Sequence, residues 1–96
     1  MLRPVESVVS RIAAIATCVE ARQPDATVME VFAQARASCE EAAAQEVSAD
    51  LKLQLAHLRT VLETWQQVWP RLATQDEFRL ALAREARLWS QRLAGR

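Results

Sequence analysis

The chain has little of what most enzyme sites and extracellular scaffolds are built from. Its 96 residues include one glycine, one histidine, two cysteines and no tyrosine. Phosphate-binding loops need glycines that let the backbone approach the phosphate, and this chain lacks them. Two cysteines do not make a disulfide scaffold, and no stretch approaches the roughly 20 uncharged apolar residues of a membrane span. We therefore expect a cytoplasmic protein with reduced thiols, no membrane segment and no small-molecule substrate.

Good helix formers supply most of what is present. Alanine is abundant, and leucine, arginine, glutamate and glutamine make up much of the remainder. Eleven of the twelve basic residues are arginine, which is typical of a GC-rich bacterial genome. The twelve acidic residues balance the basic ones, so the overall charge favours neither nucleic acid nor an acidic tail. A single domain this small has a modest core, which makes self-association plausible.

Apolar spacing predicts an all-α chain with four amphipathic helices. Breaks at Pro24, at Ser48 and after Pro70 separate helices over approximately 4–22, 28–46, 49–69 and 75–94. Similar helix lengths and short links favour an up-and-down four-helix bundle. The alternative is a pair of long helical hairpins that completes its bundle only as a dimer.

The expected helix ends carry recognisable signals. Ser48 can cap the third helix, and the segments 27–30 (TVME) and 74–77 (TQDE) both fit a capping box. Proline lacks a backbone N–H and clashes with the preceding turn. Pro70 should therefore end or kink the third helix near Trp69.

The third helix has the clearest apolar pattern. Val61 and Val68 widen its stripe, which indicates a bundle core more than a bare coiled-coil seam. The stripe itself recurs at steps of four and three: Leu51, Leu55, Leu58, Leu62, Trp65, Trp69 and Leu72. Trp65, Trp69 and Trp89 are interpreted as core residues or, alternatively, as aromatic anchors at an interface.

Two residues of the fourth helix add to a candidate interface. Leu80 is predicted to lie exposed on the polar back of this helix, and Glu85 falls within its apolar arc. A buried carboxylate without a partner is costly. We therefore expect Glu85 to pair with an arginine of another helix or of another protomer, the candidates being Arg36, Arg59 and Arg92. The candidate interface is thus Trp65, Trp69, Trp89, Leu80 and Glu85.

Charge is unevenly spread along the chain. Residues 24–50 hold six acids against one arginine, and residues 71–96 hold six arginines against three acids. A basic patch of Arg79, Arg84, Arg87 and Arg92 would suit a nucleic-acid-binding regulator, although no helix-turn-helix spacing with an intervening glycine is visible. The other interpretation is a pair of solvated faces of opposite sign.

His57, Cys18 and Cys39 are the remaining candidates for chemistry. A histidine phosphotransfer domain has Lys and Gly three and four residues after its histidine, where this chain has Thr60 and Val61. Copper-sensing helical repressors have a cysteine at the second of these positions. Cys39 lies on an apolar face and Cys18 lies off one, so the two thiols are not expected to converge. We predict no catalytic residue, no metal and no cofactor.

These observations predict a non-enzymatic helical protein–protein interaction module. The role would be that of an adaptor, a chaperone or an inhibitor, with self-association as a homodimer. In helix content and size the chain is similar to bacterial secretion chaperones, a resemblance that implies a fold and no more. A nucleic-acid-binding regulator is the alternative, and a phosphotransfer protein acting through His57 is a further one.

Overall fold

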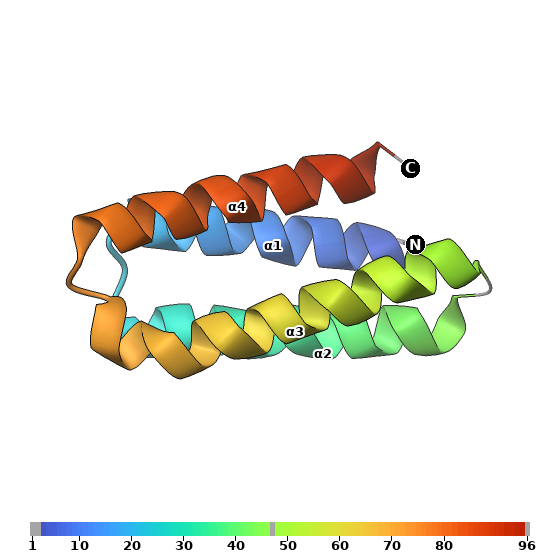
Figure 1. The fold of residues 1–96 in the computed structure, drawn as a ribbon, viewed down its shortest axis with the longest axis horizontal. Helices are drawn as coiled ribbons and strands as arrows, with labels where there is room; N and C mark the ends of the chain where they lie inside the picture. Colours follow the sequence, from blue (N-terminus) through green and yellow to red (C-terminus); the bar gives the residue numbers. More distant parts are fainter. Residues whose placement is uncertain (1–2, 47, 96) are drawn as a thin grey trace.

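The computed structural model describes residues 3–46 and 48–95, and these fold into four α-helices without a strand. The helices are α1 (Pro4–Glu20), α2 (Asp25–Gln45), α3 (Ala49–Leu72) and α4 (Asp76–Ala94). Each runs antiparallel to the next along the chain (Figure 1). The prediction of an all-α four-helix protein is confirmed.

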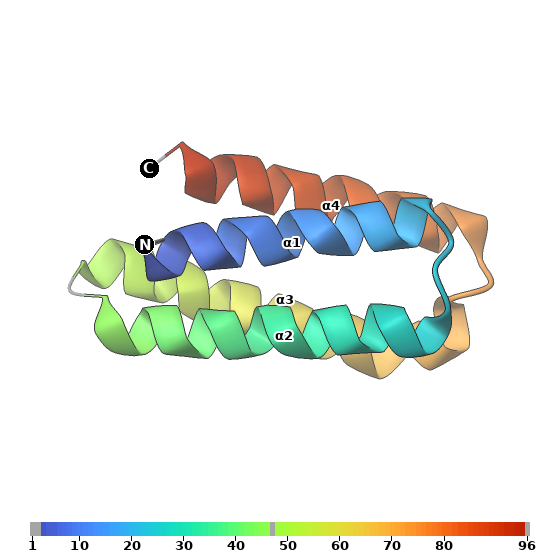
Figure 2. The same cartoon turned by 180° about the vertical axis from the view of Figure 1, so that it is seen from behind.

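The four helices form an up-and-down bundle within one chain. The α1–α2 and α3–α4 links lie at one end of the bundle, and the α2–α3 link lies at the other (Figures 1 and 2). α1 packs along both α2 and α4, and α2 packs along α3, whereas α3 and α4 approach each other at few backbone positions. One of the four sides of the bundle is therefore more widely spaced than the other three.

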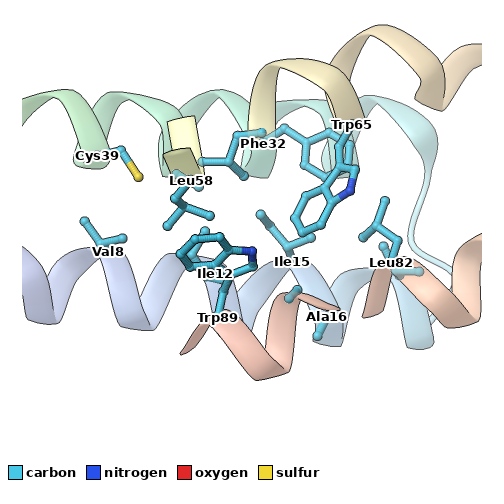
Figure 3. Close-up of a cluster of buried hydrophobic side chains, with 14 of the residues drawn as sticks. Val8, Ile12, Ile15, Ala16, Phe32, Cys39, Leu58, Trp65, Leu82 and Trp89 are labelled. Carbon is cyan, nitrogen blue, oxygen red and sulfur yellow. The ribbon is translucent and has the colours of Figure 1, made fainter. Parts of the chain in front are cut away.

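The core is built from the apolar stripes of all four helices, as their spacing predicted (Figure 3). Rings from α2 and α3 meet at its centre, where the Phe32 centroid lies 6.4 Å from that of Trp65 and 5.8 Å from that of Trp69. Burying large side chains such as these gives most of the stability of a bundle. The fully buried residues include Val8, Ile12, Ile15, Val28, Phe32, Leu58, Leu62 and Trp69.

Of the three predicted capping signals, one is confirmed and two are wrong. Ser48 caps α3, because its Oγ accepts the backbone N–H of Leu51 at 3.3 Å. α2 begins earlier than expected, at Asp25, because the carbonyl of Pro24 already accepts the N–H groups of Thr27 and Val28. The box over 27–30 is therefore inside the helix. α4 has Gln75 as its N-cap, so the box over 74–77 is displaced by one residue.

Pro70 was expected to end or kink α3 near Trp69, and it does not end the helix there. The helix continues to Leu72, and the N–H of Ala73 donates to the carbonyl of Trp69 at 2.9 Å. Pro70 itself is exposed, so its ring points outward. The proline removes one helical hydrogen bond, while burial of Trp69 and partial burial of Leu72 hold the last turn in place.

The C-terminal end of α1 is closed by a left-handed residue that is not glycine. Arg22 has φ 55°, and the N–H groups of Gln23 and Arg22 donate to the carbonyls of Cys18 and Val19, the pattern of a Schellman motif. The guanidinium of Arg22 also pairs with Asp76 at 2.8 Å. This hydrogen bond and the positive charge lower the pKa of Asp76. The link after α1 is thereby tied to the first residue of α4.

Candidate interaction surface

Aromatic contacts, and not close backbones, connect α3 with α4. The ring of His57 lies edge-on to that of Trp89 with centroids 5.3 Å apart, and Trp69 and Phe78 are 6.2 Å apart. These two contacts set the antiparallel register, in which His57 is level with Trp89 and Trp69 is level with Phe78. The wide spacing of the two backbones is bridged by large rings that reach in from both sides.

The outer surface of this side is exposed and carries two large leucines. Leu53 is 71% exposed and Leu88 is 44% exposed. Ser90 of α4 donates to the carbonyl of Val9, so this side of α4 faces α1. The opposite side of α4 holds a stripe of residues at steps of four, three and four, from Ala81 to Arg92. We call the whole surface the α3–α4 face. It consists of Leu53, His57 and Thr64 from α3 and Ala81, Glu85, Leu88 and Arg92 from α4, all of them exposed.

The three tryptophans of the candidate interface lie inside the chain's own core. Trp69 is fully buried. Trp65 and Trp89, which are labelled in Figure 3, are buried at the edge of the core. Trp69 Nε1 is buried with no hydrogen-bond partner among the described residues. The three tryptophans are therefore core residues. The exposed residues of the α3–α4 face are the ones that a partner could contact.

Leu80 is exposed on a different side of α4. It is 62% exposed and borders an open depression of about 370 Å³ between the end of α1 and the start of α4. The charged groups there are already engaged, since Arg22 pairs with Asp76 and the guanidinium of Arg79 is hydrogen-bonded. The walls of the depression are Val19, Glu20, Arg22, Asp76, Arg79, Leu80 and Ala83.

Arg79 is buried and has a structural role that the sequence analysis missed. Its Nη1 donates to the carbonyl of Ala73 at 2.8 Å and its Nη2 to the carbonyl of Val19 at 2.9 Å. The guanidinium also lies over the ring of Trp69, 5.0 Å from its centroid. Arg79 thus gives a charged donor to carbonyls at the C-terminal ends of both α1 and α3, and the Val19 carbonyl accepts the backbone N–H of Arg22 as well. One signal was available, because apolar residues follow it three and four positions later, at Leu82 and Ala83.

The remaining arginines of the candidate basic patch are only partly free. Arg87 forms an ion pair with Glu20 of α1, and that hydrogen bond raises the pKa of Arg87. The guanidinium of Arg92 lies over the ring of Trp89 at 5.2 Å. Among the described residues, Arg84 makes no ion pair, hydrogen bond or ring contact. The four arginines therefore do not present one continuous cationic surface.

Glu85 is exposed and has no ion pair within the described part of the chain. Two of its candidate partners are already used, because Arg36 and Arg59 both pair with Glu40 and Glu63 at N–O distances of 3.1–3.7 Å. Arg92, the third candidate, lies on the same helix. The expected pairing of Glu85 with an arginine of another helix is therefore not found within one protomer.

The cysteines and the histidine are not gathered into a site. Cys39 is buried, and removal from water, reinforced by the charge of Glu40, raises the pKa of its thiol to about 12. Cys18 is half-buried, and both thiols are free. Over residues 3–46 and 48–95, no group of three or more His, Cys, Asp or Glu side chains lies close enough together to hold a metal ion. His57 contributes a ring contact to the α3–α4 face.

Comparisons with known proteins give no relative: no protein-family model, no curated protein and no solved structure matches the chain. None of the described helices has the length and the apolar character to cross a membrane.

Proposed function

We propose that this protein is a non-enzymatic helical interaction module of the bacterial cytoplasm that associates with itself through the α3–α4 face. A single observation carries the proposal. The side of the bundle on which the helices approach least also exposes two large leucines, Leu53 and Leu88. An adaptor, chaperone or inhibitor would use such a surface to hold another helix.

The physical support comes from the balance of apolar and polar groups on this face. Apolar side chains gain about 25 cal/mol for each Å² removed from water, so covering both leucines favours association. Single exposed leucines are common on protein surfaces and need no explanation. Here two occur on one face above a widely spaced helix pair, beside the ring contact of His57 and Trp89.

The alternatives have no observation of this kind in their favour. Nucleic-acid binding through α4 would need several free arginines on one surface, and Arg79 and Arg87 are engaged within the chain. Phosphotransfer domains have Lys and Gly three and four residues after the histidine, where this chain has Thr60 and Val61. We therefore propose neither.

Light scattering across a concentration series tests the proposal. We expect a mass near twice the 10.8 kDa of one chain. Leu88→Asp should shift the protein to monomer, because it places a charge on the contact surface. Leu80→Asp is the matched control, since Leu80 is at least as exposed but lies on another side of α4. A monomer at every concentration, or equal behaviour of the two variants, would contradict the proposal.

A further inference from the structure

We infer that the partner on the α3–α4 face is a second copy of this chain, with the two α4 helices packed antiparallel and Glu85 of each copy facing Arg92 of the other. The inference rests on the proposed self-association and specifies its geometry. Leu88 lies next to the two-fold axis in this arrangement. The Glu85–Arg92 pair then forms twice.

The spacing of residues on α4 provides the symmetry. Ala81, Glu85, Leu88 and Arg92 form one exposed stripe at steps of four, three and four, the a/d spacing by which helices pack against one another. In a two-fold interface, if residue i contacts residue j of the partner, then j contacts i. Glu85 and Arg92 lie at equal distances on either side of the point between Leu88 and Trp89. Reversing the helix about that point exchanges them.

Neither charge is neutralised by an ion pair within residues 3–46 and 48–95. Glu85 makes no ion pair among the described residues, and Arg92 makes none there either. They cannot reach each other on the same helix, because seven residues correspond to about 10.5 Å of rise. The guanidinium of Arg92 lies over the ring of Trp89, 5.2 Å from its centroid, and this contact uses none of the N–H groups that can bind a carboxylate.

The same pattern selects one orientation of the two helices. A parallel, in-register pair would place Glu85 opposite Glu85 and Arg92 opposite Arg92, so that like charges meet on both sides of Leu88. The antiparallel pair replaces these two repulsions with two attractions. Charge complementarity of this kind determines orientation and partner choice more than total affinity. The stripe is therefore complementary to itself.

Charge reversal with recombination tests the pairing. Glu85→Arg and Arg92→Glu should each weaken the dimer by roughly tenfold, because both symmetric pairs become repulsive. An equimolar mixture of these two single variants should restore dimers. In the mixed dimer the introduced arginine of one chain meets the introduced glutamate of the other, and the native Arg92 meets the native Glu85. The double variant should also restore the dimer. Glu41→Arg is the matched control, being the same change at an exposed position of α2.

Sedimentation velocity measures these masses, and circular dichroism checks that each variant remains helical. A mixture that stays monomeric while both single variants are folded would overturn the antiparallel pairing. A dimer that neither single variant weakens would also overturn it, although the proposed self-association would still stand. A wild-type chain that is monomeric at every concentration would overturn both.

Discussion

The α2–α3 side and the α3–α4 side of the bundle share the helix α3. They differ in how many of their apolar and charged side chains find partners within the chain. On the first side the backbones pack closely and the surface charges are matched. On the second side the backbones are far apart, rings bridge the space and two leucines are exposed. There the carboxylate of Glu85 has no ion pair among the residues that the structure describes. The matched charges of the α2–α3 side are Arg36, Glu40, Arg59 and Glu63.

This difference separates folding from recognition. A side whose apolar and charged groups all find partners inside the chain contributes to stability and leaves nothing for a partner to complete. A side with exposed leucines and unpaired charges contributes less to stability. The apolar and charged groups that would pair with it must come from another molecule. Substitutions on the two sides should therefore affect different measurements.

The largest expected effect is on the closely packed side. Phe32→Ala should lower the free energy of unfolding by about 3–5 kcal/mol, because it leaves a cavity between the rings of Trp65 and Trp69. Leu88→Ala should change it by less than about 0.5 kcal/mol in the monomer, because Leu88 is already exposed. Urea denaturation at low protein concentration measures both. Equal losses would remove the distinction between the two sides.

Next in size is the loss of the buried guanidinium. Arg79→Met should lower the free energy of unfolding by about 2–4 kcal/mol, because the carbonyls of Ala73 and Val19 lose a charged donor and the ring of Trp69 loses the guanidinium over it. Arg84→Met, on the same helix but exposed, should change it by less than about 0.5 kcal/mol. Thermal and urea unfolding would show this difference, and a neutral Arg79→Met would mean that the two hydrogen bonds add no stability.

A smaller effect should appear in alkaline solution. The thiol of Cys39 has its pKa raised from 9.0 to about 12, so the folded state favours the protonated form. This stabilisation is complete below pH 9 and is lost as the pH rises toward 12, by up to about 1.4 kcal/mol per pH unit. Cys39→Ala should remove the thiol's part of the decrease in the free energy of unfolding between pH 8 and 10, as measured by urea denaturation at each pH. The same slope in both proteins would show that other groups cause it.

The smallest effect is expected from the matched surface charges. Glu63→Gln should lower the free energy of unfolding by at most about 1 kcal/mol, because exposed ion pairs contribute little. The loss should shrink further at high salt, where such pairs are screened. Denaturation at low and high salt tests this. A large, salt-independent loss would mean that Glu63 has a packing role as well.

The fold was predictable because the bundle follows directly from apolar spacing. The stripe from Leu51 to Trp69 is buried as expected, and the short links force neighbouring helices to run antiparallel. The helix ends were less predictable, since segments 27–30 and 74–77 fit a capping pattern that competing carbonyls of Pro24 and Gln75 displaced. Capping patterns in a sequence locate the end of a helix to within a few residues, but they do not determine which of several neighbouring residues is the cap.

The candidate surface was predictable only in part. Glu85 stood out because it interrupts an apolar arc, and the structure leaves it without an ion pair in the described chain. The tryptophans could not be placed as core or surface from spacing alone, and they proved to be core. Arg79 was assigned to a basic patch together with other arginines of the fourth helix, and only the meeting of two helix ends in space shows why it is buried.

The hydrogen bond from Arg79 to Val19 has a consequence for the order of folding events. It joins positions 60 residues apart, and the loop it closes contains all of α2 and α3. Closing a long loop has an entropic cost that is offset only when the last helix docks, so we expect this contact to form after the rate-limiting step. Stopped-flow measurements on Arg79→Met should then show faster unfolding with an unchanged folding rate. The guanidinium of Arg79 would then determine the lifetime of the folded bundle and leave the rate at which the bundle forms unchanged.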